Sequence, residues 1–263
     1  MQKEILTRMT TLSKIAVIIT AAGSSTKMGG SIKKEYLPLD EGTVLSACAK
    51  AFINTSKNLE QKFLLSRLIV TIPENGIKEA KTALSDLFTQ DNSLEEKIKF
   101  IQGGSTRQKS VFNALEYIRK SETIPDYVLI HDGARPFVSE KIIQQVIVDT
   151  QEFGAAAPGI TPTDTIKTVD ENGFIIKHLQ RKALTAIQTP QGFVFEKLFE
   201  AHKKAASENF EYTDDTEIWD KYFGKIKLVS GDPRNIKITY PGDLERGAGA
   251  KADTDTDFRG GSI

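Results

Sequence analysis

Short apolar runs alternate with stretches of helical periodicity along most of the chain. Four runs have the composition of buried strands, and they occupy residues 15–20, 67–72, 98–102 and 127–131. Helices are predicted near 43–53, 74–88, 139–152 and 195–206, and one more places Val111, Ala114, Leu115 and Ile118 on a common face. Later strands are expected at 225–229 and 236–239. Because the first strands are apolar on both faces, this alternation predicts an α/β fold with a Rossmann-like, mainly parallel sheet covered by helices on both sides.

One segment interrupts the alternation. Residues 164–179 contain two stretches of alternating polarity around Glu-Asn-Gly, which is a hairpin turn signal. A hairpin inserted between strand-helix units predicts a projecting arm at about residues 161–184. Its apolar positions need a surface to pack against, and they are Ile166, Val169, Phe174 and Ile176.

The length of 263 residues allows one large domain or two small ones. We interpret residues 15–246 as a single domain that carries the arm. Residues 1–14 lack the apolar centre of a secretory signal and are expected to form a flexible leader. Residues 247–263 are poor in apolar side chains and are expected to form a flexible tail.

Charge and cysteine content narrow the class of partner. Lys plus Arg and Asp plus Glu both number 35, so there is no overall basic field to favour nucleic acid or an anionic membrane. No apolar run approaches the roughly 18 residues that a membrane-spanning helix needs. The single cysteine, Cys48, excludes an internal disulfide and is expected to be a small buried residue. These features predict a cytoplasmic protein without a nucleic-acid or membrane partner.

Small and polar residues follow the predicted strands, at the edge where open α/β sheets bind ligands. They occupy residues 21–25, 103–107 and 131–135. The first loop has neither the Gly-x-Gly-x-x-Gly fingerprint of dinucleotide folds nor a Walker sequence. Lysines follow it instead, as in a loop that wraps a nucleotide while lysines reach its phosphates. The alternative is that these lysines are solvated surface charges, and they are Lys27, Lys33 and Lys34.

Seven sequence blocks together resemble one known family. The first three are AAGSSTKMGGSIKKEYL (21–37), GGSTRQKSVFNAL (103–115) and HDGARPF (131–137). The others are DTIK (164–167), QTPQGF (188–193), TDD (213–215) and NIKIT (235–239). In this order and spacing the chain resembles the 2-C-methyl-D-erythritol 4-phosphate cytidylyltransferase family over roughly residues 15 to 245. The resemblance implies a fold of the nucleotide-diphospho-sugar transferase type.

The resemblance also implies a reaction: transfer of a cytidylyl group from CTP to 2-C-methyl-D-erythritol 4-phosphate, with release of pyrophosphate and formation of 4-CDP-2-C-methyl-D-erythritol. The attacking phosphate is already anionic near neutral pH, because its second pKa is about 6. No protein nucleophile is therefore needed, which agrees with a sequence that offers no Ser-His-Asp or Cys-His arrangement.

Roles follow from the resemblance position by position. The residues implied to face the triphosphate and the transition state are Lys27, Lys34 and Lys237. Asp132 is implied to lie near a magnesium ion or the nucleotide, because two polyanions approach each other through a divalent cation. The positions implied to bind cytidine are Ala21, Ala22, Gly23, Gly104, Ser105 and Ser110. The positions implied to bind the sugar phosphate are Arg135, Thr165, Arg181 and Thr213. In the family the arm crosses to a second subunit, so the resemblance implies a homodimer.

Some positions depart from the family pattern. Lys27 replaces an arginine, Ser25 a glycine, Lys33 a proline, Glu35 a glutamine and Gly133 an alanine. A carboxylate at position 35 would repel a triphosphate unless it pointed outward. Two alternatives stay open: a ribitol 5-phosphate cytidylyltransferase, which shares the fold and most motifs, and a nucleotide-binding module without turnover.

Other polar residues have structural interpretations. His131 at a strand end is expected to hold a loop by hydrogen bonds, whereas His178 and His202 are expected at the surface. Asp214 and Asp215 are expected to cap the helix that carries the single tryptophan.

Overall fold

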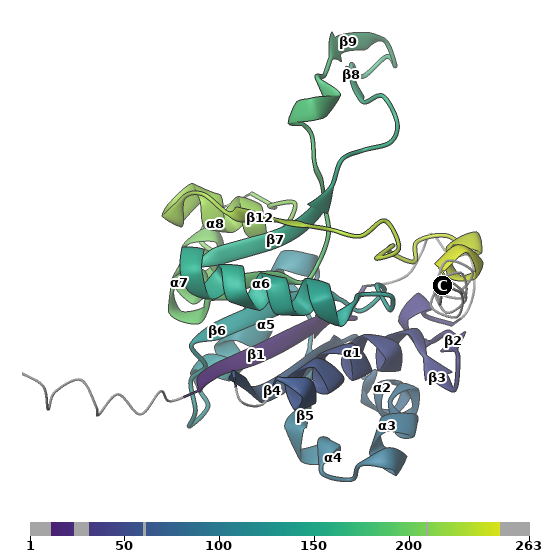
Figure 1. Ribbon diagram of the computed structural model, residues 1–263, viewed down its shortest axis with the longest axis vertical. Helices are drawn as coiled ribbons and strands as arrows, with labels where there is room; N and C mark the ends of the chain where they lie inside the picture. Colours follow the sequence, from purple (N-terminus) through teal and green to yellow (C-terminus); the bar gives the residue numbers. More distant parts are fainter. Residues whose placement is uncertain (1–11, 24–31, 60–61, 209, 248–263) are drawn as a thin grey trace, which may run out of the picture.

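The computed structural model describes residues 12–23, 32–59, 62–208 and 210–247 (Figure 1). Residues 1–11 of the expected leader, 248–263 of the expected tail, and the positions of Ser25 and Lys27 lie outside these ranges. Within them the main sheet contains β1 (Ser13–Thr20), β4 (Phe63–Ile72), β5 (Ile98–Gln102), β6 (Tyr127–Asp132), β7 (Ala155–Ile160), β10 (Ala186–Ile187), β11 (Gln191–Val194) and β12 (Lys227–Ser230). The strand order is β10-β7-β11-β6-β1-β4-β5, and β12 pairs with β7.

Helices and smaller strands make up most of the rest of the described fold, and residues 242–247 are helical as well. The α-helices are α1 (Val44–Asn58), α2 (Ile77–Ala83), α3 (Ser85–Gln90), α4 (Leu94–Lys97), α5 (Arg107–Arg119), α6 (Glu140–Phe153), α7 (Phe195–Ala205) and α8 (Asp215–Phe223). Short 3-10 turns are η2 (Lys34–Tyr36) and η3 (Arg181–Ala183). Two further two-stranded sheets pair β2 (Pro38–Leu39) with β3 (Gly42–Thr43), and β8 (Lys167–Val169) with β9 (Ile175–His178).

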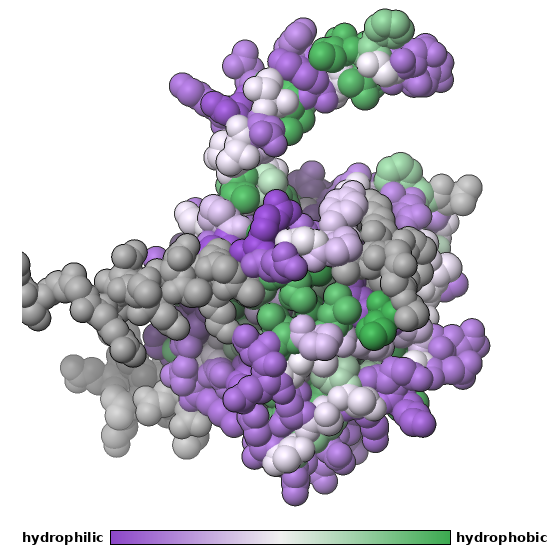
Figure 2. All heavy atoms as spheres, turned by 90° about the vertical axis from the view of Figure 1, so that its right-hand side faces the viewer, coloured by the Kyte–Doolittle hydropathy of each residue, from purple (hydrophilic) through white to green (hydrophobic). Residues whose placement is uncertain are grey.

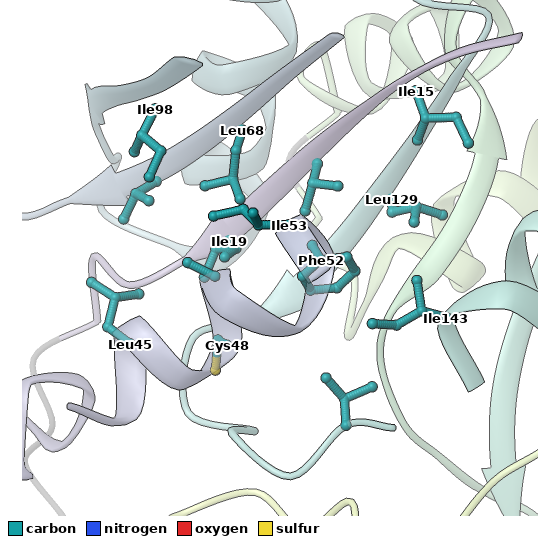
Figure 3. Packing of buried hydrophobic residues seen from close by; sticks show 14 of the residues in the cluster. Ile15, Ile19, Leu45, Cys48, Phe52, Ile53, Leu68, Ile98, Leu129 and Ile143 are labelled. Carbon is teal, nitrogen blue, oxygen red and sulfur yellow. The ribbon is translucent and has the colours of Figure 1, made fainter. Parts of the chain in front are cut away.

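The central strand β1 shows why the sheet is covered on both faces. Its residues from Ile15 to Ile19 are at most 1% exposed. Ile15, Val17 and Ile19 pack into a cluster with α1 and α6, which Figure 3 shows around Cys48 and Phe52, whereas Ala16 and Ile18 pack on the other face against α5 and α7. The predicted α/β architecture with helices on both faces is confirmed, and Cys48 is buried as expected.

Strand directions agree with a mainly parallel sheet. β1 pairs in parallel with both β4 and β6, and β4 pairs in parallel with β5. The antiparallel members are β11, which lies between β6 and β7, and the short β10. Neither was expected from the sequence, because each is a few residues long and β11 follows a proline.

Several elements differ in extent from the expectations, and three of these differences change the description of the fold. β1 begins at Ser13, so the last residues of the expected leader belong to the sheet. The helix expected near 74–88 is two helices, which meet at Leu84. Residues 236–239, expected as a strand, form an extended loop that bonds to the core through the Ile238 amide and the Ala134 carbonyl.

Side chains that cap helices set where the loops end. Thr43 and Ser46 form a capping box at α1, and Thr106, Ser139 and Asp214 each accept a backbone N–H at the start of α5, α6 and α8.

No helix among the described residues is both long and apolar enough to span a membrane.

The predicted arm stands away from the sheet. β7 ends at Ile160 and β10 begins at Ala186, and between them the chain runs out to the β8–β9 hairpin (Figure 1). Asp170 shapes the turn, because its carboxylate accepts from the amides of Asn172 and Phe174. Hydrophobic residues gather on the arm in Figure 2, and Phe174 is 70% exposed. All the apolar positions expected on the arm are exposed in the single chain, namely Ile166, Val169, Phe174 and Ile176.

His131 and Thr189 connect the segment that follows the arm to the end of β6. Nε2 of His131 lies 3.0 Å from the Arg135 carbonyl, which can only accept, so Nε2 carries the proton. Nδ1 therefore accepts from the Thr189 hydroxyl at 3.0 Å, while that hydroxyl accepts from the amide of Asp132. Burial lowers the pKa of His131 to about 4. The structural interpretation of His131 therefore agrees with its contacts.

His131 makes the stability of the protein depend on pH. Because unfolded His131 binds a proton below about pH 6.5 and the folded ring does not, the free energy of unfolding should fall by about 2 kcal/mol between pH 7 and pH 5 from this group alone. In His131→Gln this part of the pH dependence should vanish, as measured by urea unfolding at both pH values. The exposed His178→Gln variant is the control and should keep the parent slope. An unchanged slope in His131→Gln would contradict the assignment.

Candidate active site

A cavity of about 560 Å³ opens at the carboxyl ends of β1, β4, β5 and β6. Its walls come from segments that are far apart in the sequence. The lining residues that bear on its chemistry are Ala22, Gly23, Lys34, Glu35, Gly104, Ser105, Arg107, Ser110, Asp132 and Lys237.

Two small-residue loops lie against each other on one side of the cavity. The amide of Ala21 bonds to both the carbonyl and the hydroxyl of Thr71, which fixes the loop after β1 to the end of β4. An added Cβ at Gly103 would lie 2.3 Å from the Cβ of Ala22 and 2.7 Å from Oγ of Ser110. Ser110 also accepts from the amide of Gly104 at 3.0 Å. Only a residue without a side chain allows this approach of the two loops.

On another side of the cavity three cations surround the carboxylate of Asp132. Lys237 Nζ lies 3.0 Å, Arg135 Nε 3.3 Å and Arg107 Nε 3.6 Å from its oxygens. Burial alone would raise the pKa of Asp132, but the attraction of Lys237, Arg107 and Arg135 outweighs it and holds the pKa well below its usual range. Asp132 is therefore ionised at neutral pH, and the cations are gathered before any ligand binds.

Lys34 and Glu35 enter the cavity from η2. Burial lowers the pKa of Lys34, with Lys237 acting in the same direction and Glu35 against it. From the sequence, Glu35 was compatible with a bound triphosphate only if it pointed outward. In the structure it does not: Glu35 is buried and lines the cavity. Lys33 compensates this charge, because its Nζ lies 3.7 Å from the Glu35 carboxylate and also donates to the carbonyl of Gly23. The departures at positions 33 and 35 thus form a compensating pair.

The expected site residues separate into two groups. Those that line the cavity are Ala22, Gly23, Lys34, Gly104, Ser105, Ser110, Asp132 and Lys237. Ala21 is buried directly beneath, and Arg135 lies behind Asp132, where its Nη1 also donates to the Asn235 carbonyl at 2.7 Å. Lys27 lies outside the described residues.

The remaining expected residues lie away from the cavity. Thr165 and Arg181 are exposed on the arm, where Arg181 donates to the Thr163 carbonyl at 2.8 Å. Thr213 is exposed before α8, and its amide donates to Glu217. A single copy of the chain therefore does not bring these three residues to the cavity.

Arg107 lines the cavity; the sequence placed it in the strand-end segment 103–107 but assigned it no individual role. It is the first residue of α5 and bridges two carboxylates, with Nη1 2.7 Å from Asp215 and Nε 3.6 Å from Asp132. Burial alone would lower its pKa, but the two carboxylates raise it above the ordinary value. The signal was present in the sequence, since a cation directly after a strand-end Gly-Gly-Ser-Thr segment falls at the ligand-binding edge.

Two structural expectations were wrong. Asp214 caps α8, but Asp215 is buried and pairs with Arg107 and His202 instead of capping. His202 is buried on α7 and not at the surface. Its place on the apolar face with Leu198 and Ala205 required a polar partner, and Asp215 is that partner.

A mainly parallel sheet whose strand ends enclose a small-residue turn and a cluster of lysine and arginine side chains is typical of α/β proteins that bind phosphorylated ligands. Residues 15–250 match the family model for 2-C-methyl-D-erythritol 4-phosphate cytidylyltransferase. The chain belongs to this family.

Individual relatives agree with the family match. Proteins of this name from Clostridium beijerinckii and Caldanaerobacter subterraneus are each 39% identical to the chain over 88% of its length and 95% of theirs. The crystal structure of 4-diphosphocytidyl-2C-methyl-D-erythritol synthase from Anaerococcus prevotii superposes with a TM-score of 0.71 at 25% identity, covering 91% of this chain and 96% of that one. The structure of the Thermus thermophilus cytidylyltransferase gives 0.68 at 28% identity and covers 92% and 100% of the two chains.

The close approach of the two loops at Gly103 predicts that a side chain at this position destabilises the protein. Gly103→Ala should lower the free energy of unfolding by about 1–3 kcal/mol, because the added Cβ forces the two loops apart. Gly23→Ala is the matched control, since a Cβ there meets no described atom within 4 Å, and it should change stability by less than about 0.5 kcal/mol. Urea unfolding of both variants checks this, and equal losses would contradict the packing argument.

Proposed function

We propose that this protein transfers a cytidylyl group from CTP to 2-C-methyl-D-erythritol 4-phosphate, releasing pyrophosphate and forming 4-CDP-2-C-methyl-D-erythritol. The observation that carries the proposal is the convergence of Lys34, Lys237 and the turn at Ala22 and Gly23 on one cavity around Asp132. Membership of the cytidylyltransferase family supplies the identity of the two substrates.

The chain needs to position two anions and offset the charge that develops between them. Lys34 and Lys237 offer ammonium groups in the cavity wall, and a bound triphosphate would raise the pKa that burial lowers at Lys34. The loops at Gly23 and Gly104 present backbone groups on the opposite side, where a pyrimidine ring can be recognised by hydrogen bonds. The substrate phosphate attacks the α-phosphorus directly, so no side chain forms a covalent intermediate.

Magnesium fits this site as an ion carried with the nucleotide. The described residues contain no group of three or more His, Cys, Asp or Glu that could hold a metal by themselves. Asp132 is an ionised carboxylate in the cavity wall, and Mg²⁺ is typically bound by one or two carboxylates together with substrate phosphates. Asp132 would hold the ion, and the ion would supply positive charge that offsets the charge of the phosphates. Lys237, whose side chain is 42% exposed, can then turn from Asp132 toward a phosphate.

We further propose that a second copy of the chain completes the sugar-phosphate site through the arm. Thr165 and Arg181 lie outside the cavity of their own chain, and the arm exposes apolar side chains that need a covering surface. In a homodimer, the arm of one copy would bring these two residues toward Arg135 and Thr213 of the other.

Turnover with two acceptors tests the reaction. With CTP and Mg²⁺, pyrophosphate release should require 2-C-methyl-D-erythritol 4-phosphate and should be absent with ribitol 5-phosphate. Lys237→Met should slow release by about a hundredfold or more, because a cation in the cavity is lost. Lys225→Met, an exposed lysine outside the cavity, should match the parent. Release with ribitol 5-phosphate alone would assign the other acceptor, and CTP binding without release would identify a non-catalytic module.

The arm is tested by placing a charge on its apolar tip. Phe174→Asp should convert a dimer to a monomer in light scattering and raise the KM for the sugar phosphate by tenfold or more, because a carboxylate resists burial in an apolar interface. Ile77→Asp is the control: it places a carboxylate on another exposed apolar residue, at the start of α2, and should leave the dimer intact. A monomeric parent with full activity would refute this part of the proposal.

A further inference from the structure

A buried chain of polar contacts leads from the cavity wall into the helices behind it. Arg107 lines the cavity and places Nη1 2.7 Å from Oδ2 of Asp215. Oδ1 of Asp215 lies 3.0 Å from Nε2 of His202 on α7. The side chains of Asp215 and His202 are both 0% exposed, and neither residue lines the cavity. Asp215 and His202, which do not line the cavity, are thus connected to Arg107, which does.

The ionisation of Asp215 fixes the direction of these contacts. Burial alone would raise the pKa of Asp215, but Arg107 and His202 lower it below the ordinary value, so the carboxylate is charged at neutral pH. A charged carboxylate only accepts hydrogen bonds, so Nε2 of His202 is the donor. Nδ1 of His202 is buried without a hydrogen-bond partner among the described residues, which leaves Asp215 as the polar anchor of the ring.

Arg107 is held from two directions at once. Its shorter contact is with Asp215 at 2.7 Å, and its longer contact is with Asp132 at 3.6 Å. Asp215 therefore draws the guanidinium toward α8 and limits its approach to Asp132. Without the charge at position 215, Asp132 would be the carboxylate that stays in ion-pair contact with Arg107, and Asp214 would add a weaker attraction. The guanidinium would then compete with Lys237 and an incoming cation for the same oxygens.

We propose that Asp215 and His202 are positioning residues of the reaction: Asp215 holds Arg107 in the cavity wall, and His202 holds Asp215. This inference rests on the proposed function and deepens it, because it assigns a role to two side chains that touch no substrate. Arg107 makes ion pairs with both carboxylates at once through two different nitrogens, Nη1 to Asp215 and Nε to Asp132, and the single ammonium group of a lysine does not offer two such nitrogens.

A double-mutant cycle separates positioning from structural support. Asp215→Asn keeps the shape of the side chain and should lower kcat/KM for CTP by about tenfold or more, the size expected when a residue that orients a site group is lost. In an Arg107→Lys background the same change should cost less than about twofold, because the group that Asp215 positions is already altered. Additive effects would overturn the proposal. The same cycle on the CTP dissociation constant, measured by calorimetry, gives the result even if the parent shows no turnover with 2-C-methyl-D-erythritol 4-phosphate; failure of the proposed function is thereby distinguished from failure of this inference.

A second pair of variants tests His202 without changing any charge on Asp215. His202→Leu removes the donor, whereas His202→Gln can place an amide donor near the position of Nε2. Activity per folded molecule should fall in His202→Leu and return toward the parent in His202→Gln. Leu198→Ala, a buried change on the same helix, controls for loss of stability and should leave activity per folded molecule unchanged. Equal activity of His202→Leu and the parent, or equal losses in His202→Leu and Leu198→Ala, would overturn the role of His202.

Discussion

The interaction on which most of the site depends is the compensation of the negative charge of Asp132, a buried carboxylate. Asp132 ends strand β6, and a carboxylate taken out of water is costly unless cations and hydrogen bonds replace its hydration. The cations come from separate parts of the chain: Arg107 begins α5, Arg135 follows β6, and Lys237 belongs to the extended loop after β12. Neutralising Asp132 therefore fixes these segments relative to one another. The same arrangement leaves positive charge at the cavity, where a polyanionic substrate can replace part of the carboxylate's role.

The arm and the cavity share an anchor, so neither is positioned independently of the other. Thr189, on the return from the arm, bonds to the amide of Asp132 and to His131. Asn235 donates to the Thr189 carbonyl and its own carbonyl accepts from Arg135, which ties the loop of Lys237 to the same point. A shift of the arm would thus be transmitted to both sides of the cation cluster. If the arm crosses to a second copy, dimerisation and the geometry of the cavity are physically coupled.

Much of this arrangement follows from local sequence signals. The parts that could not be predicted from such signals share one cause. Periodicity predicted the helical face of α5 and the buried strands, because those residues are determined by which side meets the core. It failed at residues 236–239, where Ile238 is buried by packing on Ala134 rather than by joining the sheet. The capping prediction failed at Asp215, because a carboxylate at a helix start has the same local signature whether it caps the helix or pairs with a distant arginine. Pairings across the fold decide such cases, and a single sequence does not encode them in any one segment.

Positions 33 and 35 show how a departure from a family pattern can be conservative in physical terms. A buried glutamate beside a phosphate site is unfavourable in isolation, because it repels the ligand and loses hydration. Lys33 lies 3.7 Å from that carboxylate and also holds the carbonyl of Gly23, so the added negative charge is offset next to the turn. Two changes that each look damaging when considered singly keep the local charge balanced and tie η2 to the first loop. These two changes are therefore only weak evidence for a protein that binds nucleotide without turnover. The positions of Lys34 and Lys237 in the cavity are stronger evidence, and they favour an enzyme.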